Sequence, residues 1–279
     1  MATLPPVRIS PEPLVAVVNL ADESRKKTEE QKSKQYEVEL KLWNEANTTR
    51  SKEQTINYIK LYPNGSFCEL AQAQLDEILK KEGEKKILVI SSPDNKFSEG
   101  SSSGISNYTI ADSFRFEISD ILSQNVINSY TNVVTRVTDE LIEFDGGARI
   151  IDRLGNDIKS INARFVTPAQ LFPSEYSVGK KWSTRFRWVR AGSYGVSDTE
   201  LHFKILKRER LNRSIGDFNA FYIEGDGHVL DNGAKIMTKM WIDPDKCPQP
   251  LVFEWWGYNR AGRYSTTDRT TLVAYEKKA

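Results

Sequence analysis

From Tyr108 to the C-terminus, apolar and polar residues alternate with a period of two, and this pattern constrains the fold more than any other feature of the chain. Phe114 and Phe116, for example, alternate with Arg115 and Glu117. Alternation of this kind is typical of β-strands that bury one face. The same pattern recurs in three further stretches, residues 133–138, 182–189 and 201–205.

Short turn sequences separate these stretches. Three are typical of tight hairpin turns: Asp145-Gly146-Gly147, Leu154-Gly155-Asn156 and Asn232-Gly233. Residues 168–179 form the one long irregular crossing. Roughly ten strands with short connections predict antiparallel pairing and exclude a parallel sheet with crossover helices. We expect an α+β chain whose β domain is a twisted sheet, a half-barrel or a barrel-like structure.

The segment 21–86 has a different composition and predicts helices. It contains thirteen acidic and thirteen basic residues, which suit helices with solvated faces. One apolar stripe has the spacing of a single helix face and consists of Tyr36, Leu40 and Trp43. Two capping boxes mark the starts of a second and a third helix, Ser51 with Gln54 and Ser66 with Glu69. Three short helices of this kind predict a docking or spacer module.

These patterns divide the chain into four parts. Residues 1–20 are expected to be an extended, proline-containing lead-in, and residues 21–86 the helical module. Residues 87–107 combine a short strand at Ile87 to Ile90 with a linker that contains seven serines. Residues 108–279 form the antiparallel β domain. We expect proteases to cut first in the serine-rich linker, from Ser91 to Asn107.

Charge and cysteine content exclude several classes of protein. The 39 basic and 38 acidic residues leave a net charge of +1, which excludes nucleic-acid binding by bulk charge. Two cysteines and two histidines exclude a disulfide framework and a Cys/His zinc cage. We expect Cys68 in the first turn of the third helix, with a lowered pKa, and Cys247 in an exposed or half-exposed turn.

Targeting signals are absent from the sequence as it stands. The apolar run from Leu14 to Val18 is too short for a signal peptide, and prolines interrupt the region before it. No stretch has the length of a membrane span. We therefore expect a soluble, cytoplasmic protein, or a protein of the cell envelope if an export signal was removed.

Two regions resemble bacterial sequences of a known kind. The run from Tyr58 to Phe67, preceded by Leu42-Trp43 and followed by Leu70-Ala71, resembles a helical segment found beside caspase-like peptidase domains. Its Tyr-Pro-x-Gly turn is also similar to tetratricopeptide-like hairpins. The C-terminal half resembles an uncharacterised bacterial all-β domain that accompanies such proteins. The matching motifs are Val178 to Trp182, Gly216 to Glu224, Val137 to Glu140 and Asp152 to Asn156.

This resemblance covers residues 36–82 and 108–276 and implies a twisted antiparallel sheet or half-barrel without a known activity. A caspase-like peptidase needs a His-Gly motif and a nucleophilic cysteine on an α/β sheet, and this chain has neither. The resemblance therefore implies an accessory role and argues against proteolysis by this chain.

One group of residues has the composition of a metal site. Glu224, Asp226 and His228 are two residues apart, so in an extended strand their side chains would share one face. Gly225 and Gly227 favour a bulge or turn, which would scatter the three ligands. We therefore predict no metal and no cofactor, and a metal-dependent enzyme is the third of three hypotheses.

Two further groups are candidates for binding. A basic surface that could meet an acidic partner consists of Arg185, Arg187 and Lys204. Five tryptophans that could line an apolar cavity, or fill the core, are Trp182, Trp188, Trp241, Trp255 and Trp256.

The first hypothesis is accordingly a non-catalytic binding or scaffolding protein, accessory to a larger bacterial system. The second is a carrier of a hydrophobic ligand in the concave face of the β domain. A protein partner or an apolar small ligand is expected, and nucleic acid is not.

Overall fold

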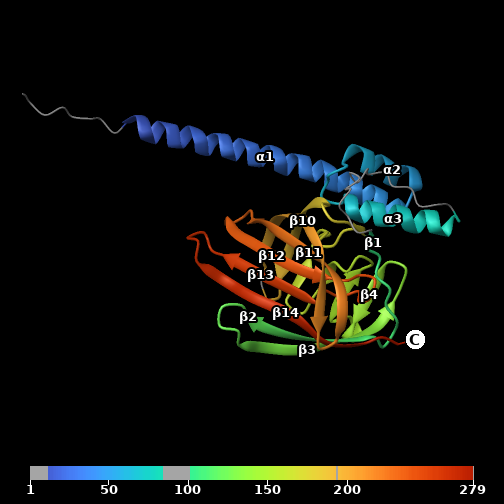
Figure 1. The fold of residues 1–279 in the computed structure, drawn as a ribbon. Coiled ribbons are helices and arrows are strands. Elements are labelled where there is room, and N and C mark those ends of the chain that lie inside the picture. Colours follow the sequence, from blue (N-terminus) through green and yellow to red (C-terminus); the bar gives the residue numbers. More distant parts are fainter. Residues whose placement is uncertain (1–11, 84–100, 193, 279) are drawn as a thin grey trace, which may run out of the picture.

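A computed structural model describes residues 12–83, 101–192 and 194–278, with three helices that precede a β-barrel (Figure 1). The helices are α1 (Glu12–Thr49), α2 (Lys52–Leu61) and α3 (Cys68–Lys81). The predicted α+β class, helices first and antiparallel strands after, is confirmed. The helix α1 begins at Glu12, inside the segment that was expected to be an extended lead-in.

The first predicted capping box forms only in part, because the Gln54 side chain accepts from the Thr49 hydroxyl and not from the Ser51 backbone N–H. The side chain of Ser51 accepts a hydrogen bond from the Gln54 backbone N–H at 3.4 Å and caps α2. The helix α3 begins after Phe67 without a side-chain cap. The Glu69 carboxylate, expected to fold back on this helix, instead accepts hydrogen bonds from the β domain, as described below. The sequence pattern was right about the start of α3 to within two residues and wrong about its cap.

The predicted stripe on α1 forms the centre of a small helical core. Tyr36 and Trp43 are buried, and the Trp43 ring stacks on Phe67 with 6.0 Å between ring centroids. Tyr58 from α2 completes this aromatic cluster at 5.6 Å from Trp43. Aromatic burial of this kind accounts for most of the packing energy of a module this small.

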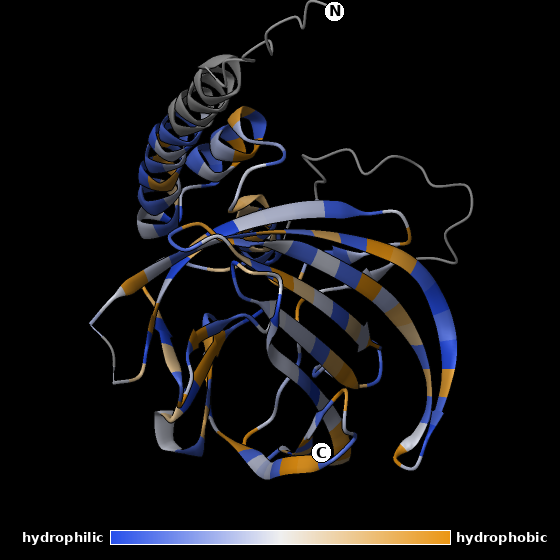
Figure 2. Cartoon of the chain, turned by 90° about the vertical axis from the view of Figure 1, so that its left-hand side faces the viewer, coloured by the Kyte–Doolittle hydropathy of each residue, from blue (hydrophilic) through white to orange (hydrophobic). Residues whose placement is uncertain are grey.

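Twelve strands within the described residues close into an antiparallel barrel. In spatial order they are β10 (Val196–Arg213), β11 (Gly216–Val229), β12 (Ala234–Ile242), β13 (Val252–Tyr258), β14 (Tyr264–Glu276), β2 (Ser113–Asp120), β3 (Val126–Val137), β4 (Leu141–Phe144), β5 (Arg149–Asp152), β6 (Asp157–Lys159), β7 (Ala163–Phe165) and β9 (Lys181–Arg190). The barrel closes where β9 pairs with β10. Polar and apolar bands alternate along the strands (Figure 2), as the period of two requires.

Part of the predicted linker belongs to the β domain. Ser102 and Ser103 form strand β1, which pairs with β8 (Glu175–Tyr176) beside the barrel. The Ser102 hydroxyl also donates to Asp245 at 2.7 Å. Residues 101–107 are therefore not a free linker. The predicted strand at Ile87 to Ile90 and the rest of the linker lie outside the described residues.

The helical module packs on strand β9 and on the long crossing between β7 and β9. Tyr36 donates a hydrogen bond to Thr167 at 3.0 Å, and the Arg185 guanidinium lies 4.7 Å from the centre of the Tyr36 ring. The carboxylate of Glu69, only 2% exposed, accepts from Ser174 and pairs with Lys180 at 2.8 Å. Because these contacts are buried and polar, they fix the orientation of the module on the barrel.

Candidate ligand site

A cavity of about 420 Å³ lies inside the barrel. The residues that line it come from strands β2, β3, β5, β6, β13 and β14 and from the crossing between β7 and β9. The buried side chains of Phe116, Phe172 and Gln249 form its deep end, whereas Asn128 and Ile161 are exposed and mark its mouth.

One wall of the cavity is apolar. Its principal residues are Phe116, Ile118, Leu171, Phe172, Pro250 and Phe253. Phe116 also stacks on Tyr130, with 5.3 Å between ring centroids. An apolar wall of this size offers surface to a hydrocarbon or aromatic body.

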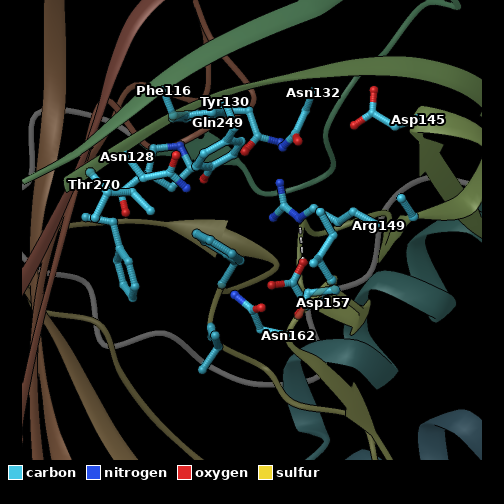
Figure 3. Close-up of a pocket in the computed structure, with 18 residues that line it drawn as sticks. Phe116, Asn128, Tyr130, Asn132, Asp145, Arg149, Asp157, Asn162, Gln249 and Thr270 are labelled. Atoms are coloured by element: carbon cyan, nitrogen blue, oxygen red, sulfur yellow. Dashed lines mark hydrogen bonds and ion pairs between the residues drawn. The ribbon is translucent and has the colours of Figure 1, made fainter. Parts of the chain in front are cut away.

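The opposite wall carries an ion pair. Arg149 Nε donates to Asp157 Oδ1 at 2.7 Å, and Figure 3 shows the two side chains pointing toward each other in the cavity. Arg149 is two residues from Ile151 on the same strand, so both face the barrel interior. The Arg149 guanidinium also lies 5.5 Å from the centre of the Phe144 ring.

The ion pair with Asp157 keeps Arg149 in its charged form. Burial acts to lower the pKa of Arg149, but the charge and hydrogen bond of Asp157 outweigh burial, so the pKa lies above its usual value. For Tyr130, which is on β3 and separated from β5 by β4, burial acts in the other direction and raises the pKa of the hydroxyl. Arg149 therefore stays protonated, and Tyr130 stays a neutral hydroxyl at physiological pH.

Amide side chains complete the polar wall. Asn132 is 7% exposed, lines the cavity, and its Nδ2 has no hydrogen-bond partner among the described residues. Gln249 is 4% exposed and donates to the Tyr108 hydroxyl at 2.6 Å. The wall therefore has an unused hydrogen-bond donor beside a fixed arginine.

None of the five candidate tryptophans lines this cavity. Trp182 is buried in the core and stacks on Phe203 at 5.1 Å between centroids. Trp188 donates to Thr199 at 3.0 Å, and Trp241 donates to Glu209 at 2.9 Å. Trp255 packs against the core, and Trp256 lies 5.1 Å below the ammonium group of Lys239. Each ring thus has protein neighbours away from the site.

The proposed basic surface is largely covered by the chain itself. Arg185 donates twice to Asp198, at 3.0 and 2.7 Å, and lies against Tyr36 of α1. Arg187 pairs with Glu37 of the same helix. Lys204 alone of the three is exposed. Two of the three cations therefore contribute to docking of the helical module.

Glu224, Asp226 and His228 do share one face, contrary to the bulge expected from the neighbouring glycines. Strand β11 runs through all five positions, and Gly225 and Gly227 face the interior, where Gly225 pairs with Phe203. On the outer face, Lys204 and Lys239 flank Glu224. Within the described ranges, no group of three or more acidic, histidine or cysteine side chains has the geometry of a metal site.

Both cysteines differ from expectation. Burial raises the pKa of the Cys68 thiol, although it lies at the start of α3, because desolvation outweighs the helix terminus. Cys247 is fully buried rather than exposed, and burial raises its pKa to about 12. Neither thiol is therefore a reactive group.

The site residues missed from the sequence had a weak signal. Arg149 and Asp157 flank a predicted hairpin turn, and each stands beside isoleucines in a short apolar strand. Arg149 shares its strand face with the buried Ile151, but Asp157 shares its face with Lys159, so the sequence alone does not indicate the pair. Two of the five tryptophans, Trp255 and Trp256, are on β13, but the residue of that strand that lines the cavity is Phe253.

Fold and cavity together define an α+β protein whose closed antiparallel barrel contains a cavity of small-molecule size. No family model matches the chain, and no curated protein is significantly similar to it. The resemblance to the β domain beside caspase-like peptidases therefore stays a prediction.

Three solved structures of bacterial proteins are similar to this chain. One, from Bacteroides fragilis, is provisionally described as exported with a YmcC-like fold (TM-score 0.42, 10% identity, 63% of this chain and 100% of that chain). A second structure, from Parabacteroides distasonis, is provisionally described as a lipoprotein. Its TM-score is 0.40 and its sequence identity 9%, and the match covers 62% of this chain and 99% of that chain. The third is the hypothetical lipoprotein YmcC from Escherichia coli. Its TM-score is 0.36 and its sequence identity 10%, and the match covers 62% of this chain and 90% of that chain. These descriptions give no support to the expected cytoplasmic location.

Across the part of the chain that the structure describes, no helix combines the length and the apolar character needed to cross a membrane.

Proposed function

We propose that this chain is a non-catalytic binding protein that carries a small amphipathic molecule inside its barrel. The cavity of about 420 Å³ carries the proposal, because an apolar wall and an internal ion pair line the same space. The volume lies within the roughly 300–1,000 Å³ that is usual for small-molecule sites.

The polar wall favours a ligand that supplies hydrogen-bond acceptors. Arg149 uses Nε for Asp157, and its two terminal amino groups have no hydrogen-bond partner among the described residues. Nδ2 of Asn132 is a further unused donor. The two outer N–H groups of an arginine match the two oxygens of a carboxylate. We therefore assign the ligand a carboxylate head at Arg149 and an apolar body against Phe116 and Phe253.

The same residues support binding rather than catalysis. An arginine guanidinium does not exchange its proton at physiological pH, so it cannot act as an acid or base. It can orient a ligand by charge and by its fixed fork of donors. The expected carrier of a hydrophobic ligand is thereby refined to an amphipathic one.

A protein partner is the second candidate, and one surface favours it. Leu122, Val126 and Ile127 on the β2–β3 hairpin are each 61% exposed. Exposed apolar side chains that cluster on one hairpin are typical of contact surfaces. This surface lies next to Asn128 at the mouth of the cavity.

A dye-binding experiment tests the carrier function. N-phenyl-1-naphthylamine, a neutral apolar dye, should fluoresce more strongly in the presence of the wild-type chain than in buffer alone. Thr270→Trp fills the cavity and should weaken this binding roughly tenfold or more, which corresponds to about 1.4 kcal/mol. Thr271→Trp is the control, because Thr271 is the neighbouring residue and does not line the cavity. Equal dye binding by both variants would contradict the proposal.

A second arm tests the head group. Decanoate should displace the dye from the wild type. The double variant Arg149→Met/Asp157→Leu removes both charges of the pair together, so neither is left without its partner. This double variant should still bind the dye, but decanoate should no longer displace the dye from it. Unchanged displacement would leave the cavity as a ligand site and refute the carboxylate assignment.

A further inference from the structure

Strand β3 has a partner on both sides along only part of its length. Residues 126–133 run along β2, whereas β4 pairs with β3 only from Val134 to Val137. Among the described residues, no strand pairs with residues 126–133 on the side away from β2. We call this stretch the free edge of β3. It follows a hairpin that projects from the barrel (Figure 1), and every residue from Val126 to Thr131 is exposed.

The backbone groups of the free edge of β3 point in two directions. The Val134 N–H donates to the Asp112 carbonyl at 2.8 Å, on the β2 side. Since the direction alternates along a strand, the N–H and C=O groups of Ser129, Thr131 and Val133 point away from β2. Outward backbone groups of this kind are a template for a further strand.

Two contacts agree with this direction. The Ser129 N–H donates to the side chain of Asn128 at 2.8 Å, and the Val133 N–H donates to the side chain of Asp145 at 3.0 Å. Thr131 lies between them and faces no strand on this side within the described residues. The Asn128 contact is local and exposed, so a partner strand can replace it by strand addition.

The sequence of the free edge of β3 lacks the charges and prolines that usually protect an exposed strand edge. From Ile121 to Thr135 the chain has no charged residue, no proline and no glycine. Strand β10 provides a comparison within the same barrel. Its residues 207–213 pair with β11 alone among the described strands, and five of these seven residues are charged. The chain thus protects one strand edge with charge and leaves the other without it.

Apolar side chains surround the free edge of β3. Leu122, Val126 and Ile127 are each 61% exposed, and Tyr130 is 37% exposed. An uncharged segment of β-branched and aromatic residues has a high tendency to pair with other strands. The free edge therefore favours a specific partner that covers both its backbone groups and these side chains.

A second copy of this chain supplies such a partner. The partner must contribute an extended, uncharged segment with an edge of its own to pair, and β3 is itself that segment. In a twofold contact, residues near the axis lie opposite their own copies. A charge there would meet a like charge, and the stretch from Ile121 to Thr135 contains none.

We propose that two copies of this chain associate through the free edge of β3, by antiparallel pairing of the two β3 strands around a twofold axis near Tyr130. Ser129 of one copy then exchanges backbone hydrogen bonds with Thr131 of the second copy. Ile127 lies near Val133 of the second copy, so apolar contacts flank the paired backbone. The proposal rests on the second candidate function, a protein partner at this hairpin, and not on the carrier function.

Sedimentation velocity on the full chain tests the proposal. The wild type should form a dimer, and no larger species, as its concentration rises. Thr131→Lys brings two like charges together near the axis and should raise the dissociation constant roughly tenfold or more. Asn212→Lys is the matched control, because it adds the same charge to an exposed position on the charged edge of β10 and should leave the dimer unchanged.

A mixture of two variants tests whether the free edge of β3 pairs with its own copy. Thr131→Glu alone should dimerise as weakly as Thr131→Lys. An equimolar mixture of the two should recover the dimer, because opposite charges then face each other across the axis. A mixture that stays monomeric would show that the contact is not a twofold pairing of β3 with β3.

Hydrogen exchange on the wild type gives a readout that needs no variant, so it holds even if the variants at position 131 fail to fold. Protection of the Thr131 amide should increase with protein concentration, because a partner strand accepts its hydrogen bond. The Tyr130 amide points toward β2 in either state. Its protection should not change, and it serves as the internal control.

Three further results would overturn the proposal. A wild type that stays monomeric leaves the hairpin as a surface for a different protein. An open-ended series of larger species shows pairing through two different edges. A dimer that Thr131→Lys does not weaken lies elsewhere on the chain. Binding of N-phenyl-1-naphthylamine by Thr131→Lys, whose altered residue does not line the barrel cavity, tests the carrier function separately.

Discussion

At the scale of single residues, the close approach of two strand backbones explains why position 227 is a glycine, which the sequence pattern could not explain. Strand β11 carries Gly227 on its inner face, where a Cβ atom would lie 1.9 Å from the Glu200 carbonyl oxygen. Period-two reasoning treated this glycine as a strand breaker, because a one-dimensional pattern contains no information on how closely two strands approach. The same reasoning located the alternating faces correctly.

Gly227→Ala should therefore destabilise the barrel by about 1–3 kcal/mol or more. Gly257→Ala is the matched control, since its Cβ would meet the movable Ser265 hydroxyl at 2.9 Å instead of backbone. Chemical denaturation of both variants measures the difference. A cost for Gly227→Ala no greater than that for Gly257→Ala would show that β10 and β11 separate easily.

Asp152 provides a prediction about pH. Burial raises the pKa of this carboxyl to about 6, although Asn156 and the backbone N–H of Leu154 donate to it. Between about pH 4 and pH 6, Asp152 is therefore protonated in the folded state and ionised in the unfolded state, whose pKa is near 3.9. The free energy of unfolding of the wild type, relative to Asp152→Asn, should rise as the pH falls from about 6 to 4. Denaturation curves across this pH range measure the difference in the free energy of unfolding between the wild type and Asp152→Asn. A difference that does not change with pH would contradict the burial of this carboxyl group.

At the scale of elements, the amphipathic helices and the strand alternation were predictable because each depends on local periodicity. The stripe of Tyr36 and Trp43, the cap at Ser51 and the hairpin turns all follow from neighbours in the sequence. The docking of the module was not predictable. Glu69 fits a capping box equally well, and only the position of Lys180, more than a hundred residues away, determines which partner it takes.

The Glu69–Lys180 pair should matter more than any surface pair on the module. Glu69→Gln leaves Lys180 without its partner in a buried position, which typically costs about 3–5 kcal/mol. Lys180 is 16% exposed, so we expect the lower part of this range. Glu82→Gln removes an exposed pair with Lys52 at the end of the same helix and should cost about 0–1 kcal/mol. Equal melting of the two variants would show that the module is held by other contacts.

At the scale of the whole molecule, the interior cavity was the least predictable feature. The strand count and antiparallel order limited the possible architectures, but closure depends on how many strands pair and with what stagger. The sequence distinguished neither a filled core from a cavity nor tryptophans in the core from tryptophans at a site. Arg149 and Asp157 become a recognisable pair only once β5 and β6 are placed inside a closed barrel.

Proteolysis tests how the two parts of the chain hold together. The serine-rich sequence predicts cleavage before residue 101, whereas residues 101–107 should resist because β1 pairs with β8. After cleavage, the two fragments should remain together on size-exclusion chromatography, because the module docks through buried groups such as Tyr36 and Glu69. Separation of the fragments under native conditions would contradict the interface, and cuts within 101–107 would contradict the β1–β8 pairing.

The order of strands in the barrel has a consequence for how the protein is made. Apart from β8, neighbours in the barrel follow one another along the chain, and β14 pairs with β2, so Tyr275 lies opposite Phe114. On the ribosome, every barrel strand after β2 can pair with its predecessor as it emerges, and β14 then has to pair with β2 as well. The free edge of β2 stays unpaired until β14 has been synthesised. During that interval the nascent sheet exposes two unpaired edges, which are templates for aggregation. A cell that makes this protein must therefore protect the open barrel from aggregation until β14 has paired with β2.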